Sequence, residues 1–154
     1  MLDGMPFLCN FAATMDYKLK KDEKLCSRKA IDHLFNDGKS LMAFPLRAAY
    51  RLRPTGMHPV QFLISIPKKR VHKAVDRVAL RRRVRETYRL SRHELLTSVL
   101  EQTGLGVDIA FVYLDKTLAP YSVIDEKMRS LLQRIAHAAT EQSASAPTTS
   151  QTAE

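Results

Sequence analysis

Residues 60–92 read VQFLISIPKKRVHKAVDRVALRRRVRETYRLSR, and this stretch decides the fold. Its first part, Val60–Ile66, is a short apolar run of the length of a buried strand, and Pro67 follows it directly. After a basic loop, residues 74–100 show apolar side chains at the helical period of 3.6, which predicts one long helix. A strand, a loop and a helix are therefore expected in direct succession.

The residues before this stretch predict a helix and a second strand. Ser27 is a suitable N-cap and Gly38 a suitable stop for a helix over Ser27–Asp37. A further apolar segment spans Pro45–Leu52, and the turn-forming residues 53–56 (RPTG) separate it from Val60–Ile66. Two such segments around a turn predict an antiparallel hairpin.

The residues after the stretch predict a strand and a last helix. Gly104 and Gly106 precede VDIAFVYL at Val107–Leu114, the most strand-like run in the chain. Pro120 precedes a helical pattern over Ser122–Ala138. The predicted order is α-β-β-α-β-α, which is typical of an α+β two-layer sandwich with helices packed against a small sheet.

The length of 154 residues fits one domain. We expect residues 1–16 to be a flexible extension, residues 17–139 the folded domain, and residues 140–154 a disordered tail too polar to bury a core. Met15 precedes the basic run Tyr17–Lys21, so translation starting at Met15 is a further hypothesis.

Positive charge is concentrated in one segment. The chain has 25 Lys+Arg against 16 Asp+Glu, a formal net charge of +9, and residues 68–92 alone carry a local excess of nine. At about 100° per residue, one arc of the helix holds Arg77, Arg81, Arg82, Arg85, Arg89 and Arg92, beside an inner face of Leu80, Val84, Tyr88 and Ser91. The alternative is an ordinary solvated face, but like charges repel at this spacing and arginine binds phosphate with two hydrogen bonds. This pattern favours an RNA-binding ridge.

Signatures of a catalytic or metal site are missing from the sequence. Cys9 and Cys26 form no paired motif, and there is no Gly-rich phosphate loop, HExxH or GxSxG sequence. We therefore expect no catalytic residue and no metal ligand in this chain. No apolar run has the length of a membrane span and no signal peptide is recognisable, so we expect no membrane contact and a cytoplasmic location.

Three motifs carry a family resemblance: FLISIPKK at 62–69, KAVDR at 73–77 and RRRVRE at 81–86. Together they resemble the protein subunit of bacterial ribonuclease P. The resemblance covers about Leu25 to Ala138 and includes a Phe-x-x-Gly motif, here residues 35–38 (FNDG). One departure stands out, because Val78 and Ala79 replace the Asn and Arg that follow the first arginine in the family.

The resemblance implies a fold and a division of labour. The fold would be similar to domain 2 of ribosomal protein S5, with a left-handed βαβ crossover. The holoenzyme would be an endoribonuclease in which the RNA subunit, with Mg2+, removes the 5′ leader of precursor tRNA. The protein would hold no cofactor of its own and would act as a monomer within the ribonucleoprotein, with the catalytic RNA subunit and precursor tRNA as its partners.

The resemblance, together with the helical arc, also assigns residues. RNA contacts are expected from Lys68, Lys69, Lys73, Arg77, Arg81, Arg82, Arg85 and Arg89. A leader-binding cleft between the first helix and the sheet would contain Ile31, Phe35 and Tyr50, where aromatic rings can stack on bases. A different class of function stays open at this point, namely an RNA-binding module associated with the ribosome or another structured RNA and without a role in cleavage.

Overall fold

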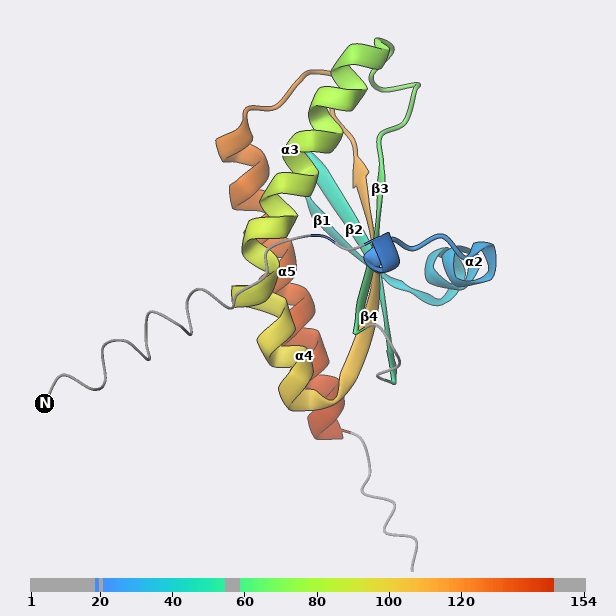
Figure 1. Ribbon diagram of the computed structural model, residues 1–154, viewed down its shortest axis with the longest axis vertical. Helices are drawn as coiled ribbons and strands as arrows, with labels where there is room; N and C mark the ends of the chain where they lie inside the picture. Colours follow the sequence, from blue (N-terminus) through green and yellow to red (C-terminus); the bar gives the residue numbers. More distant parts are fainter. Residues whose placement is uncertain (1–18, 20, 55–58, 146–154) are drawn as a thin grey trace, which may run out of the picture.

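The computed structural model describes residues 19, 21–54 and 59–145 (Figure 1). Its elements are η1 (Lys21–Glu23), α2 (Arg28–Asp37), β1 (Lys39–Ala43), β2 (Leu46–Pro54), β3 (Val60–Ser65), α3 (Ala74–Arg92), the π-helical turn η2 (His93–Thr97), α4 (Ser98–Thr103), β4 (Leu105–Tyr113) and α5 (Tyr121–Ser145). The α+β class is confirmed, and the strand β1 is present in addition to the predicted elements.

The strands form one sheet in the order β1-β2-β4-β3. β2 pairs antiparallel with both β1 and β4, and β3 pairs parallel with β4. The predicted antiparallel hairpin of β2 with β3 is therefore wrong, and residues 55–58 of its expected turn lie outside the described part of the chain. β4 separates the two strands because residues 106–111 are all buried, and a strand buried on both faces takes a central position.

The long helix predicted from the sequence is confirmed. α3, η2 and α4 form one helical run from Ala74 to Thr103. Gly104 ends it at φ +68°, a left-handed conformation that glycine adopts without steric cost, and its N–H donates to the Leu100 carbonyl at 3.0 Å. The run joins β3 to its parallel neighbour β4, which gives the βαβ crossover unit that the resemblance implies.

Gly38 explains the Phe-x-x-Gly motif. Its N–H donates to the Leu34 carbonyl at 2.9 Å, and the chain turns there from α2 into β1. A Cβ atom at Gly38 would lie 2.1 Å from the Leu34 carbonyl oxygen and 3.0 Å from that of Tyr50. Any side chain at this position would force the backbone apart, so glycine fixes the angle between helix and sheet.

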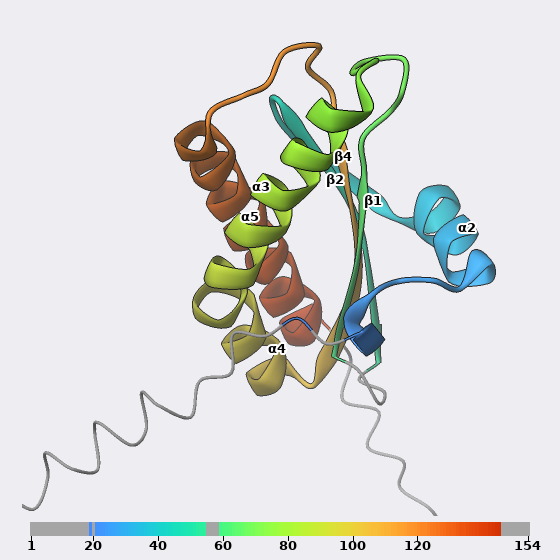
Figure 2. The ribbon, with the colours of Figure 1, turned by 45° about the horizontal axis from the view of Figure 1, so that its top comes forward.

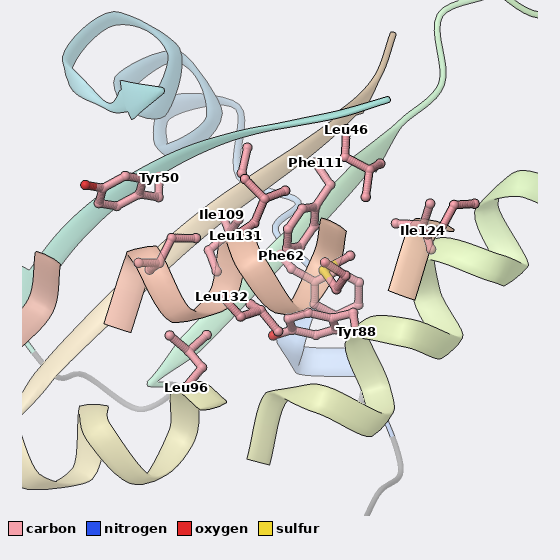
Figure 3. Close-up of a cluster of buried hydrophobic side chains, with 14 of the residues drawn as sticks. Leu46, Tyr50, Phe62, Tyr88, Leu96, Ile109, Phe111, Ile124, Leu131 and Leu132 are labelled. Atoms are coloured by element: carbon pink, nitrogen blue, oxygen red, sulfur yellow. The ribbon is translucent and has the colours of Figure 1, made fainter. Parts of the chain in front are cut away.

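The main core lies between the sheet and the layer formed by α3 and α5. Tyr88 of α3 is fully buried at its centre, with its ring centroid 4.5 Å from that of Phe62 and 5.6 Å from that of Phe111 (Figure 3). These aromatic contacts attach the inner face of α3 to β3 and β4. The outer face of α3 is thereby turned to solvent.

The helix α2 covers the opposite face of the sheet (Figures 1 and 2). Its buried Leu34 packs in a separate, smaller cluster with Leu25, Ala49 and Ala110. Side chains of β2 therefore divide between two environments, even-numbered residues in the main core and odd-numbered ones toward α2, as strand alternation requires.

The ends of the chain differ in part from the prediction. α5 continues through Ser145, so residues 140–145 are helical and do not belong to the tail as predicted. The proposed extension 1–16, the start at Met15 and tail residues 146–154 lie outside the described residues. Among the described helices, none has the length and apolar character needed to cross a membrane.

Candidate nucleic-acid interface

The inner face of α3 is the one predicted from the helical period. Leu80, Val84, Tyr88 and Ser91 are all fully buried against the sheet and α5. Because these four residues fix the rotation of α3, they also fix which arginines face solvent. The orientation of the basic ridge thus follows from the apolar pattern of the same helix.

Three arginines of the ridge are exposed: Arg81, Arg82 and Arg85. Within the described residues none of the three makes a hydrogen bond or ion pair. A guanidinium group presents a planar fork of donors that matches two oxygens of one phosphate. The three side chains therefore form a surface on which a polyanion finds uncompensated donors.

The loop between β3 and α3 adds exposed cations to this surface. Ile66 and Val71 are buried and anchor the loop, while Lys68, Lys69 and Lys73 are exposed and have no ion pair in the part of the chain that the structure describes. The loop leads directly into the first turn of α3. Its lysines therefore continue the arginine surface at the N-terminal end of that helix.

Arg77 has a structural task in addition to its predicted one. Its Nη1 donates to the carbonyl oxygens of Val71 at 2.9 Å and His72 at 2.7 Å. These bonds hold the lysine loop against the first turn of α3. Its RNA contact stays a prediction, and any phosphate at Arg77 would have to use the remaining guanidinium nitrogens.

Arg89 is exposed in part and is paired within its own helix. Its Nε donates to Glu86 at 3.0 Å and its Nη2 at 2.5 Å, a bidentate contact between residues three positions apart. The hydrogen bond from Arg89 lowers the pKa of the Glu86 carboxyl. Arg89 therefore contributes less uncompensated positive charge than the exposed Arg81, Arg82 and Arg85.

Arg92 departs from the predicted arc, because its side chain is only 5% exposed and forms an ion pair with Glu23 of η1. The helical wheel predicted Arg92 in the solvent-facing arc, and the structure shows it buried. The residues after η1 run beside β3, and Glu23 of η1 holds the Arg92 guanidinium there. The ridge consequently ends one turn earlier than predicted.

An open groove runs beside the ridge where Val78 departs from the family pattern. Its volume is about 410 Å³, and it lies between Lys24–Cys26, β3 and α3. Val78 is 48% exposed and lines this groove together with Arg81, Arg82 and Arg85. Val78 therefore forms an apolar patch among the guanidinium groups. Nothing in the fold explains why valine stands at this position.

The structure does not bring the three predicted leader residues together. Ile31 is half-buried in the cluster under α2, and Phe35 on the same helix is 52% exposed. Tyr50 lies on the opposite face of the sheet in the main core, 4% exposed, and burial raises the pKa of its hydroxyl (Figure 3). The prediction that Tyr50 and Phe35 share one cleft is therefore wrong. Neighbouring residues of a strand point to opposite faces of the sheet, and Ala49, not Tyr50, faces α2.

Two arginines that the sequence reasoning did not single out lie on the α2 side of β2. Arg47 and Arg51 share the odd-numbered face with Ala49, which is in the α2 cluster. Arg47 is exposed and its Nε donates to Ser40 at 2.8 Å. The signal was present in the alternation of residues 46–53 (LRAAYRLR), which assigns Tyr50 to the core with Leu46 and Leu52.

Metal-ligating side chains do not cluster in the described residues. No three His, Cys, Asp or Glu side chains there lie close enough to hold one metal ion. Cys26 is a free, exposed cysteine.

The fold is a small mixed sheet with a crossover helix, and the outer face of that helix carries arginines that have no partner among the described residues. These features are typical of a basic α+β RNA-binding protein. A family model described as "Ribonuclease P" matches residues 19–136. The chain belongs to the ribonuclease P protein family.

Individual relatives agree with this assignment. The ribonuclease P protein component of Porphyromonas gingivalis is 37% identical over 123 residues, covering 78% of this chain and 88% of the relative. That of Chlorobium phaeobacteroides is 29% identical over 127 residues, covering 76% and 87%. Among solved structures, the RNase P protein of Thermotoga maritima matches at 26% identity with a TM-score of 0.58, covering 72% of this chain and 96% of that one.

Proposed function

We propose that this chain binds the catalytic RNA of ribonuclease P through the exposed cations of α3 and of the loop before it. The observation that carries the proposal is that six of the eight predicted RNA contacts are exposed and unpaired within the described residues, namely Lys68, Lys69, Lys73, Arg81, Arg82 and Arg85. Such donors are what phosphate groups require. The rigid attachment of α3 to the sheet presents them in a fixed arrangement.

The chain is the protein subunit that works with the catalytic RNA in removing the 5′ leader of precursor tRNA. The holoenzyme is an endoribonuclease, and the RNA carries the chemistry. We place the magnesium ions with the RNA subunit, because phosphate oxygens are the hard ligands that Mg2+ prefers. We further propose one protein copy in each ribonucleoprotein and a cytoplasmic location, where precursor tRNA is available.

For the leader we propose the α2 side of the sheet. Phe35 offers an exposed ring for stacking, Ile31 an apolar contact beside it, and Arg47 and Arg51 offer cations on the neighbouring strand. Aromatic rings next to a basic surface are the usual means of holding single-stranded RNA. We leave Tyr50 out of this proposed surface, because its side chain is buried in the main core.

Salt dependence tests the phosphate contacts directly. If the six unpaired cations each neutralise one phosphate, the slope of log K against log salt concentration should be about −4 to −5 for RNA binding, at roughly 0.7–0.9 per contact. The measurement is a titration of the wild-type protein with a bacterial ribonuclease P RNA at several salt concentrations. A slope near zero would contradict the arginine surface as the main contact.

A further inference from the structure

The side of α3 that faces the start of α5 carries a second pocket. It is open to solvent, has a volume of about 700 Å³, and is lined by Leu19, Arg82, Arg83, Arg85, Glu86, Arg89 and Tyr121. The leader surface and the groove at Val78 do not include Tyr121. The lining thus combines one aromatic ring with several arginines.

Tyr121 is the first residue of α5, which begins beside α3 (Figures 1 and 2). Tyr121 is 41% exposed, whereas the other tyrosines of the described residues are buried. Partial burial raises the pKa of the Tyr121 hydroxyl, and the nearby carboxylates of Asp125 and Glu86 act in the same direction. The ring therefore stays a neutral phenol at physiological pH.

The wall that carries Tyr121 is held rigidly. Arg83 Nη1 donates to the carbonyl of Ala119 at 2.7 Å, which ties the loop before α5 to α3. The Tyr113 hydroxyl accepts from the Ala119 N–H at 3.0 Å and donates to the Thr117 carbonyl. Because the loop is fixed at several points, Tyr121 is positioned before any ligand arrives, which lowers the cost of binding.

The rim of the pocket combines paired and unpaired cations. Arg82, Arg85 and Arg89 lie at spacings of three and four residues, so they form one stripe along α3. Glu86 pairs with Arg89, whereas Arg82 and Arg85 have no partner in the described chain. The pocket therefore offers an aromatic surface with two free guanidinium groups beside it.

We propose that this pocket binds one unstacked nucleotide of the catalytic RNA, with its base on the Tyr121 ring and the flanking phosphates at Arg82 and Arg85. The inference rests on the proposed function and deepens it. Arg82 and Arg85 line both this pocket and the groove at Val78, so an RNA strand bound to the ridge reaches the pocket without leaving the same cations. An aromatic ring flanked by arginines is a stacking site for single-stranded RNA.

The test compares Tyr121→Leu and Tyr121→Phe with wild type in titrations against a bacterial ribonuclease P RNA. Loss of stacking should weaken binding of Tyr121→Leu roughly tenfold, whereas Tyr121→Phe keeps the ring and should bind within about twofold. The salt slope of Tyr121→Leu should equal that of wild type, because no charge is removed. Arg85→Ala provides the matched comparison, since its slope should fall by about 0.7–0.9.

A second measurement uses the unaltered complex. Ultraviolet irradiation of the wild-type protein with the same RNA, followed by mass spectrometry, should give a nucleotide adduct on Tyr121. Unchanged affinity of Tyr121→Leu, or adducts only at other residues, would overturn the pocket while leaving wild-type RNA binding, and hence the proposed function, intact. Absence of salt-sensitive binding by wild type would overturn both.

Discussion

Replacing Arg81 and Arg85 together by alanine should weaken binding to the catalytic RNA about 100-fold. Hydrogen bonds that involve a charged group contribute about 1.5–3 kcal/mol each, and each 1.4 kcal/mol corresponds to a factor of ten. Both side chains are exposed and unpaired within the described chain, so their removal should leave the free energy of unfolding within about 0.5 kcal/mol of wild type. The measurements are an RNA titration and a denaturant unfolding curve.

The matched control removes two cations that lie off the proposed surface, Lys116 and Lys127. Its net charge equals that of the Arg81→Ala, Arg85→Ala double variant, but its RNA affinity should stay within about threefold of wild type, because distant charges act only through a screened field. Equal losses in the two variants would show that overall charge, and not the ridge, determines binding. Unchanged affinity of the arginine variant would remove the two residues from the interface.

Replacing Glu23 by alanine should destabilise the fold by about 3 kcal/mol. Arg92 is buried and its Nη1 donates to the Glu23 carboxylate, so the substitution leaves a buried guanidinium without the carboxylate that faces it. Breaking a buried ion pair from one side costs about 3–5 kcal/mol, and the lower end applies here because the Glu23 side chain is 22% exposed. The measurement is the free energy of unfolding from denaturant titration.

A second variant distinguishes the cost of leaving the Arg92 charge without Glu23 from the cost of losing the other contacts of the Glu23 side chain. Combining Glu23→Ala with Arg92→Leu removes the buried charge as well, and should recover more than half of the lost stability. Glu101→Ala on the exposed side of α4 serves as the control for the change in net charge and should be neutral. If Glu23→Ala is as stable as Glu101→Ala, the pair does not hold η1 on α3.

The order of helices and most strands followed from local patterns. The helical period of residues 74–100 and the caps at Ser27 and Gly104 define their helices with side chains that are close in the sequence. Strand pairing depends instead on which strand is buried on both faces, and here that is β4, the last to appear. The hairpin prediction failed for this reason, and β1 was missed because its short edge sequence, Lys39–Ala43, has no strong alternation.

In the candidate site, too, positions set by the helical period were predicted, and positions set by contacts between distant segments were not. The helical wheel placed Arg81, Arg82 and Arg85 in solvent because the inner face of α3 is strongly apolar. It failed at Arg92, since no pattern within α3 indicates that Glu23, far earlier in the sequence, pairs with it. Tyr50 was misplaced although alternation along β2 contains the answer, and Tyr121 was missed because its partners come from a helix more than thirty residues earlier.

The most direct test of the central claim is cleavage of precursor tRNA at low magnesium by a bacterial ribonuclease P RNA, with and without this protein. We expect that the protein stimulates cleavage at the mature 5′ end, that it is inert alone, and that Val78 and Ala79 are tolerated. Salt-sensitive RNA binding without any stimulation would contradict the account. The chain would then be an RNA-binding module without a role in cleavage, and the missing Asn-Arg pair would be its first explanation.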